Sequence, residues 1–129
     1  LRKCYESFPA LKQVSCYACC SDILRKSDEE LKALRQAGLK LVFIGLESGD
    51  QAVLDLMNKG ATVRDQIDSV KKANQAGIET SVTVIIGLGG RKGSRQHAIN
   101  TGKAASEMNP TYFSALTLMV VPGSPWTGW

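Results

Sequence analysis

Four cysteines are the first residues whose type and spacing could do chemistry, and they are Cys4, Cys16, Cys19 and Cys20. Cys16 and Cys19 form a C-x-x-C pair, which is the spacing of redox pairs and of half a zinc site. A complete zinc site needs two further ligands, and only Cys4 and His97 remain among the cysteines and histidines. The sequence therefore favours ordinary reduced thiols, with a redox or accessory-ligand role for the pair as the alternative.

The same cysteines fall short of an iron–sulfur signature. Cys16 and Cys20 are spaced as the first two residues of C-x-x-x-C-x-x-C, but Ile23 stands at the third position. Iron–sulfur clusters are held by cysteine thiolates. We therefore do not expect these cysteines to hold a cluster.

A carboxylate and a hydroxyl follow an apolar run in Gly45–Asp50. An ionised group such as Glu47 is costly near the end of a buried strand unless it has a partner. Glu47, with Ser48 beside it, could accept a hydrogen bond from a ligand amine or a ribose hydroxyl. Alternatively, Glu47 pairs with a neighbouring Lys or Arg. We expect Asp50 only to cap the next helix.

The glycine-rich run Gly87–Ser94 nearly matches two phosphate-binding motifs. A P-loop requires G-x-x-x-x-G-K-S/T, but here Lys92 precedes Gly93. The spacing of Gly87, Gly89 and Gly93 is one residue longer than the dinucleotide fingerprint. The run predicts either a close approach of backbone to a ligand or simply a turn that requires glycine.

Two further features are less specific. His97 is the only histidine, so no Ser-His-Asp triad is indicated, and a structural or capping role is the simpler interpretation. Val120–Pro125 contains prolines that either shape one rim of a site or only end a strand.

Apolar, β-branched runs alternate with helical patterns. A nearly continuous apolar run is typical of a strand buried on both faces, as in parallel sheets. Alternating strands and helices predict an α/β fold with a parallel sheet, whose ligands bind at the carboxyl ends of the strands. The expected strands are Leu11–Tyr17, Lys40–Leu46, Thr80–Gly87 and Tyr112–Val121, and the expected helix starts are Ser27, Asp50, Thr62 and Ser94.

The composition fits a globular domain. The chain has 129 residues, with 43% hydrophobic and 22% charged residues and a net charge of +4. This composition argues against disorder, and the scattered basic residues argue against a nucleic-acid partner. No run is long enough to span a membrane, and Lys3, Glu6 and Lys12 interrupt any signal peptide. We therefore expect a cytoplasmic protein that does not bind membranes.

Several motifs, taken in order, resemble the radical S-adenosylmethionine (radical SAM) enzymes. The resemblance is to the branch of oxygen-independent coproporphyrinogen oxidase-like and B12-associated members, and it covers residues 12–125. It is carried by Phe43–Asp50, Val53-Leu54, Met57–Gly60, Ala76–Ile78, Val84–Gly90 and Pro122–Pro125.

The resemblance implies a partial (β/α)6 barrel. Such enzymes hold a [4Fe–4S] cluster on three cysteines after the first strand and bind S-adenosylmethionine (SAM) to the open iron. SAM is cleaved to methionine and a 5′-deoxyadenosyl radical. Our chain corresponds to the third to sixth strands, so we expect a single truncated domain over 1–129, with 126–129 as a tail outside the core. The cluster loop is missing, and Cys16, Cys19 and Cys20 do not replace it.

The resemblance further implies a SAM-binding wall. Glu47 matches the residue that contacts the SAM ribose or amino group, and Lys59 matches a basic position for the SAM carboxylate, although a solvated helix end is its alternative interpretation. The complete set of expected SAM-binding residues is Glu47, Ser48, Lys59, Ile86, Gly87, Leu88, Val121 and Pro122.

Three functional hypotheses follow. The first is a fragment of a radical SAM oxidoreductase, inactive by itself, whose small-molecule substrate the sequence does not reveal. The second is a Rossmann-like nucleotide-binding domain that uses Gly87–Gly93. The third is a non-enzymatic interaction module, because a slice of a barrel exposes strand edges that recruit partners. Because of these exposed edges, we expect the isolated chain to self-associate.

Overall fold

The computed structural model describes residues 1–123, so the predicted tail at 126–129 lies outside the described residues. Helices and strands alternate along most of this length. In chain order they are α1 (Arg2–Ser7), β1 (Val14–Tyr17), α2 (Cys20–Leu24), α3 (Asp28–Gln36), β2 (Leu39–Glu47), α4 (Gln51–Leu56), α5 (Val63–Gln75), β3 (Glu79–Ile86), α6 (Gly90–Met108) and β4 (Tyr112–Thr117).

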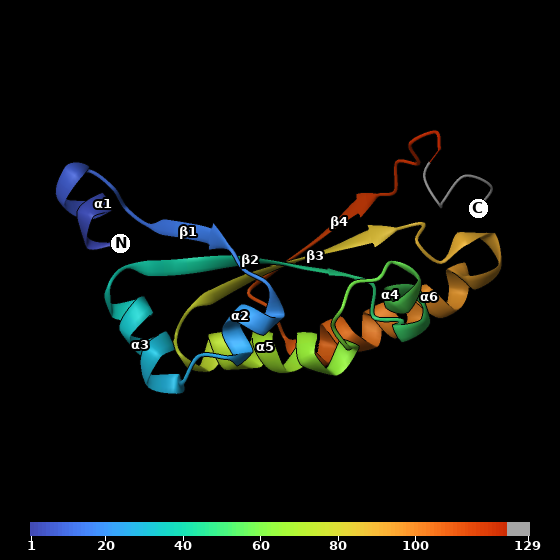
Figure 1. The fold of residues 1–129 in the computed structure, drawn as a ribbon, viewed down its shortest axis with the longest axis horizontal. Coiled ribbons are helices and arrows are strands. Elements are labelled where there is room, and N and C mark those ends of the chain that lie inside the picture. Colours follow the sequence, from blue (N-terminus) through green and yellow to red (C-terminus); the bar gives the residue numbers. More distant parts are fainter. Residues whose placement is uncertain (124–129) are drawn as a thin grey trace.

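The four strands form one sheet in the order β1-β2-β3-β4, and every neighbouring pair is parallel (Figure 1). This topology confirms the predicted α/β fold with a parallel sheet and flanking helices. It also places the carboxyl ends of the strands along one edge of the sheet. No described helix is both long and apolar enough to cross a bilayer.

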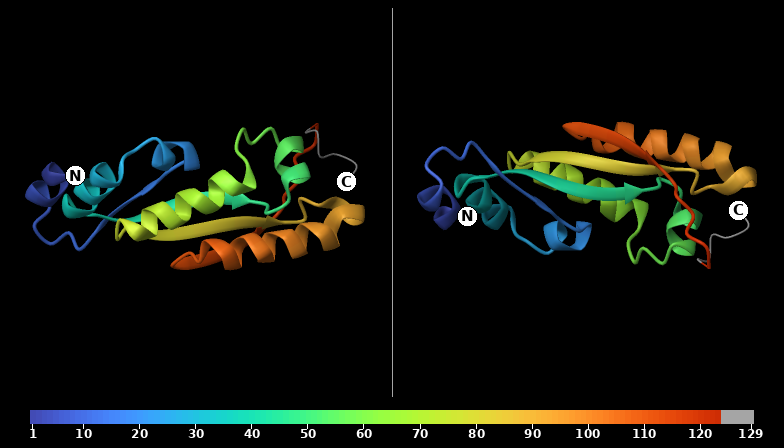
Figure 2. Two further views of the ribbon diagram at one scale, coloured as in Figure 1. Left: turned by 90° about the horizontal axis from the view of Figure 1, so that it is seen from below. Right: turned by 90° about the horizontal axis from the view of Figure 1, so that it is seen from above.

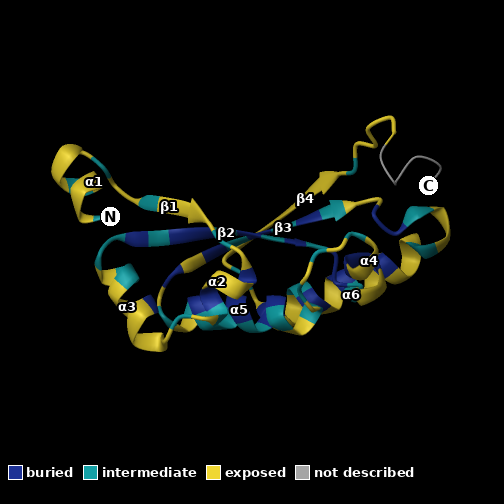
Figure 3. Cartoon of the chain, viewed as in Figure 1, coloured by how far each residue is buried: buried dark blue, intermediate teal, exposed yellow. Residues whose placement is uncertain are grey.

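The core lies between the sheet and helices α2, α3, α5 and α6, which pack on one face (Figure 2). Figure 3 shows the buried residues concentrated in β2, β3 and the inner side of α5. The opposite face of the sheet is not covered by any described helix. The buried cluster includes Ile23, Leu31, Val42, Ile44, Leu46, Ile67, Val70, Ile78, Val82, Val84, Ala104 and Met108.

Capping residues begin α3 and α5 where the sequence predicts. At α3, Ser27 accepts from the Glu30 amide while the Glu30 carboxylate accepts from the Ser27 amide. The same reciprocal capping box joins Thr62 and Asp65 at α5. Each box satisfies two amides that the first turn of a helix leaves without partners.

The structure differs from the prediction at several places. Strand β1 begins at Val14 rather than at Leu11. Helix α6 begins at Gly90 rather than after Ser94, because the Gly90 amide already closes a turn onto the Gly87 carbonyl. Two short helices, α1 and α2, carry too few turns to show an apolar period in the sequence. Strand β4 ends at Thr117 instead of Val121.

The α5 capping box gives stability a predictable dependence on pH. The Thr62 hydroxyl and amide both donate to the Asp65 carboxylate, and they lower its pKa below the ordinary 3.8. The contribution of the ionised Asp65 to the free energy of unfolding is therefore complete above that ordinary pKa. It is lost as the pH falls through the lower pKa of the folded state. Asp65→Asn should lower the urea midpoint at neutral pH and flatten its fall as the pH drops through 3.8 and below. Parallel pH profiles for the two proteins would contradict this assignment.

Candidate active site

The carboxyl ends of β2, β3 and β4 lie side by side at one edge of the sheet. Glu47 pairs with Val84 on β3, and Ile86 pairs with Thr117 on β4. The Leu118 amide continues this ladder by donating to the Ile86 carbonyl at 2.9 Å. Residues predicted from three separate sequence motifs therefore share one edge.

Strand β2 ends in a strained turn centred on Glu47. The Ser48 amide donates to the Leu46 carbonyl at 2.7 Å, which closes a three-residue γ-turn, and Glu47 has φ 61°. The strand register also shifts between Gly45 and Glu47. Positive φ in a γ-turn is rare and strained, and such strain is concentrated at functional sites. The bulge changes the direction of the Glu47 side chain at the strand end.

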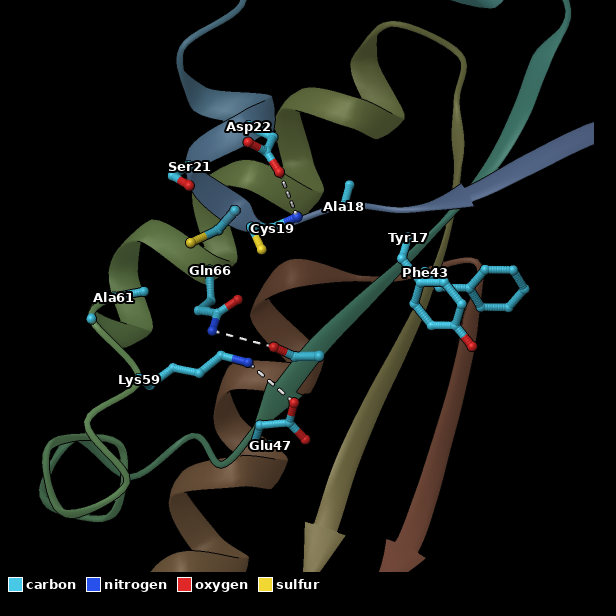
Figure 4. A pocket seen from close by; sticks show the side chains of 13 residues that line it. Tyr17, Ala18, Cys19, Ser21, Asp22, Phe43, Glu47, Lys59, Ala61 and Gln66 are labelled. Atoms are coloured by element: carbon cyan, nitrogen blue, oxygen red, sulfur yellow. Dashed lines mark hydrogen bonds and ion pairs between the residues drawn. The ribbon is translucent and has the colours of Figure 1, made fainter. Parts of the chain in front are cut away.

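Glu47 forms an ion pair with Lys59 across this turn (Figure 4). Lys59 Nζ lies 3.1 Å from Glu47 Oε1, and the Lys59 amide bonds to the Leu54 carbonyl just after α4. The side chains are 29% and 20% exposed, so both reach solvent. Gly45 makes room for the pair, because a β-carbon there would collide with Glu47 Oε1. The alternative predicted for Glu47, a neighbouring basic partner, is therefore present.

A cavity of about 370 Å³ opens beside this pair, between the ends of β1 and β2 and the segment that precedes α5. Gln66, which is buried on α5, donates to the Gly45 carbonyl at 3.4 Å (Figure 4). The sequence analysis did not predict a role for Gly45 or Gln66. The available signal for Gln66 was its position as a polar residue among the apolar residues that α5 buries. The described residues that line the cavity also include Tyr17, Ala18, Cys19, Phe43, Gly60 and Ala61.

The remaining predicted residues divide into two groups. Ile86 and Val121 are 58% and 67% exposed, and Gly87 has φ 102° with Leu118 directly beside it. Pro122 is exposed as well, and none of these residues lines the cavity. Leu88 and Ser48, in contrast, are buried.

Ser48 is held by His97, a contact that the sequence did not predict. The Ser48 hydroxyl lies 2.8 Å from His97 Nδ1, and His97 Nε2 lies 3.1 Å from the Ile85 carbonyl. A β-carbon on Gly89 would lie 2.7 Å from His97 Cβ. The glycine-rich run therefore allows α6 to pack closely, and Gly90–Gly93 is already helical rather than a phosphate-binding loop.

The cysteines do not converge. Cys16 lies in an apolar groove between β1 and α3, whereas Cys19 and Cys20 border the cavity at the carboxyl edge. Burial raises the pKa of the Cys16 and Cys20 thiols, which disfavours the thiolate that metal binding requires. Cys19 instead caps α2, where its amide bonds to Asp22 at 3.1 Å. Within residues 1–123, no group of three His, Cys, Asp or Glu side chains is arranged to hold a metal ion.

A sequence model of the radical SAM superfamily matches residues 6–101, well over half of the chain. The chain belongs to the radical SAM superfamily. Two curated proteins are similar to the chain in sequence. An uncharacterised methyltransferase of Pyrococcus horikoshii is 28% identical over 98 residues, which are 76% of our chain and 21% of that protein. The anaerobic magnesium-protoporphyrin IX monomethyl ester cyclase of Rubrivivax gelatinosus is 35% identical over 91 residues, 70% of our chain and 16% of the cyclase.

Solved radical SAM structures share the fold of this chain. Methylornithine synthase (PylB) superimposes with a TM-score of 0.74 at 15% identity, covering 99% of our chain and 35% of the synthase. Coproporphyrinogen III oxidase (HemN) from Escherichia coli gives 0.70 at 21% identity, covering 85% and 24%. The radical SAM chain thus spans about a third or less of these structures and about a fifth or less of the two curated relatives.

The family's two cofactors fit this radical SAM chain differently. The described residues do not fit a [4Fe–4S] cluster, because the cysteines face separate places and supply no three-ligand set. The charges of Lys59 and Glu47 are complementary to those of the methionyl group of SAM, which carries one carboxylate and one ammonium.

Proposed function

We propose that the chain is the SAM-binding wall of a radical SAM oxidoreductase and is inactive without the rest of that enzyme. SAM, when reduced by an electron from a [4Fe–4S] cluster, supplies a 5′-deoxyadenosyl radical that takes hydrogen from a substrate. The observation that carries the proposal is the strained Glu47 turn, which holds a carboxylate against Lys59 at the carboxyl edge of a parallel sheet. Proteins rarely maintain such strain without a functional reason.

The ion pair explains how the chain would hold the methionyl group. Without a ligand, Glu47 and Lys59 neutralise each other at 3.1 Å. A bound methionyl group brings a carboxylate for Lys59, and its ammonium or the ribose hydroxyl comes to Glu47. One partly exposed ion pair is thereby replaced by two charge-assisted contacts, which are stronger than neutral hydrogen bonds.

The apolar part of the edge explains how the chain would hold adenine. Ile86 at the end of β3 and Val121 in the segment that follows β4 both expose apolar side chains that a flat ring could cover. Gly87 places backbone without a side chain next to them. Exposed apolar surface of this kind is costly in water and gains most from being covered by a ligand.

The test is SAM cleavage by the full-length protein that contains this chain. Purified without oxygen, reconstituted with iron and sulfide and supplied with a reductant, it should convert SAM to methionine and 5′-deoxyadenosine. Titration with NAD(P) and ATP checks the competing nucleotide-binding hypothesis. Saturable micromolar binding of either nucleotide, together with no 5′-deoxyadenosine, would overturn the proposal.

The edge strand β4 supports a second property, self-association of the isolated chain. All six residues of β4 are exposed, among them Phe113 and Leu116, and residues 108–123 carry no charge. Natural sheets usually protect such edges with lysine, proline or a covering element. We propose that two copies pair along β4.

Sedimentation of the isolated chain tests this pairing. We expect a mass that rises with concentration and a shift towards monomer in Leu116→Lys, because a charge on the edge opposes pairing. A monomer at every concentration would contradict the proposal.

A further inference from the structure

His97 links the two strand ends that make up the proposed SAM wall. It lies on α6 and is 6% exposed. One ring nitrogen contacts Ser48, the neighbour of Glu47 on β2, at 2.8 Å. The other contacts the Ile85 carbonyl, next to Ile86 on β3, at 3.1 Å. A single side chain therefore joins both segments.

The hydrogen-bonding chemistry fixes the direction of both contacts. A carbonyl oxygen only accepts, so His97 Nε2 carries the proton and donates to Ile85. In the neutral ring, Nδ1 is then an acceptor, and the Ser48 hydroxyl donates to it. The Ser48 oxygen also accepts from the Asp50 amide at 2.9 Å. Both ring nitrogens of His97 and the Ser48 hydroxyl thus have partners inside the protein.

The surrounding backbone is shaped to bring α6 against these turns. The Gly49 amide donates to the Thr101 hydroxyl at 2.9 Å, one helical turn after His97. A β-carbon on Gly49 or Gly89 would collide with α6, in the second case with His97 itself. Two consecutive residues after Glu47 are therefore anchored on α6.

These anchors oppose relaxation of the strained turn. Glu47 at φ 61° persists only where the surroundings hold the chain on both sides. The β2 ladder holds one side and α6, through Ser48 and Gly49, holds the other. We propose that His97 is a positioning residue, which keeps Glu47 and the Ile86–Leu88 segment at the separation that SAM requires. The inference rests on the proposed SAM-binding function.

Two substitutions of His97 test its two hydrogen bonds separately. Gln at position 97 places an amide near Nε2 and can still donate to Ile85, but it leaves Ser48 without its acceptor. Asn at position 97 places its oxygen near Nδ1 and retains the Ser48 contact, but it leaves Ile85 without its donor. The experiment measures equilibrium binding of SAM to the reconstituted full-length protein, together with KM and kcat for 5′-deoxyadenosine formation.

The Ser48 contact should matter more, because Ser48 adjoins Glu47. His97→Gln should raise the SAM dissociation constant about tenfold and His97→Asn about threefold, with KM rising in parallel and kcat nearly unchanged. Ser48→Ala should reproduce His97→Gln, and the double variant should be no worse than either single variant, because both remove the same contact.

Met108→Ala is the matched control for loss of stability alone. Met108 is buried on the same helix, 1% exposed, and lies eleven residues or about 16 Å beyond His97. Its truncation should lower the unfolding temperature at least as much as His97→Gln while leaving SAM binding unchanged.

The outcomes distinguish the inference from the function on which it rests. SAM binding within twofold of wild type in His97→Gln and Ser48→Ala would overturn the positioning role alone, as would equal weakening by Met108→Ala. A wild-type protein that binds no SAM would overturn the proposed function, and the positioning role with it. If His97→Gln does not fold, Ser48→Ala and His97→Asn decide the question.

Discussion

Gly49→Ala should lower the free energy of unfolding by about 2–3 kcal/mol, the upper part of the range for overpacking a buried site. The added β-carbon would lie 2.5 Å from the Asn100 carbonyl oxygen and 2.6 Å from Thr101 Cα. Both are backbone atoms of α6, which cannot rotate away as a side chain could. The helix must therefore move outward and give up the bond between the Gly49 amide and Thr101.

The matched control is the same substitution on the helix itself. A β-carbon on Gly102 meets nothing within 4 Å, and Gly102 is exposed in the middle of α6. Gly102→Ala should therefore stabilise the protein by up to about 1 kcal/mol through helix propensity. Urea unfolding followed by circular dichroism measures both variants. Equal effects of the two substitutions would show that α6 does not pack tightly on Gly49.

Removing either partner of the Glu47–Lys59 pair should weaken SAM binding by about 10- to 100-fold, because charge-assisted contacts contribute about 1.5–3 kcal/mol. Glu47→Gln retains the shape of the side chain and removes its charge, while Lys59→Met retains most of the stem. The double variant should lose less SAM-binding free energy than the two single variants lose together, because each partner also orients the other at 3.1 Å. Equilibrium binding of SAM to the reconstituted full-length protein is the measurement.

Charge changes elsewhere on the chain supply the controls. Glu79→Gln alters an exposed carboxylate at the opposite end of β3, and Lys103→Met removes an exposed cation from α6. Both should bind SAM as the wild type does. If SAM binding instead changed with the net charge of the protein, whichever residue is substituted, the effect would be a general electrostatic one. That result would argue against a specific role for the Glu47–Lys59 pair.

Local signals in the sequence were sufficient to predict the sheet and most helix starts. The apolar runs around Ile44 and Val84 indicated parallel strands, and the structure confirms parallel pairing throughout. Ser27 and Thr62 marked two helix starts, because a capping box is encoded within four consecutive residues. The radical SAM resemblance is likewise confirmed, since the sequence model of that superfamily matches residues 6–101.

Contacts between distant residues could not be predicted from the sequence. Nothing local indicates that Ser48 turns away from the edge towards His97, 49 residues later. In a regular strand, side chains alternate between the two faces of the sheet, so the face of a strand-end residue can be predicted. The register shift between Gly45 and Glu47 breaks that alternation. The shared edge and the place of Glu47 on it were predictable, whereas the burial of Ser48 and Leu88 was not.

Cys19 shows a related limit. Its spacing from Cys16 suggested redox or metal chemistry, yet its place in the fold is the cap of α2. A five-residue helix leaves almost no periodic signal in the sequence. The C-x-x-C pattern therefore stood out in the sequence while the capping role did not.

A crystal structure of the full-length protein with SAM would test the central claim most directly. Our account predicts the methionyl group within hydrogen-bonding distance of Glu47 and Lys59, with adenine against Ile86 and Val121. SAM bound away from the carboxyl edge of β2 and β3, or a nucleotide seated on Gly89–Gly93, would contradict it.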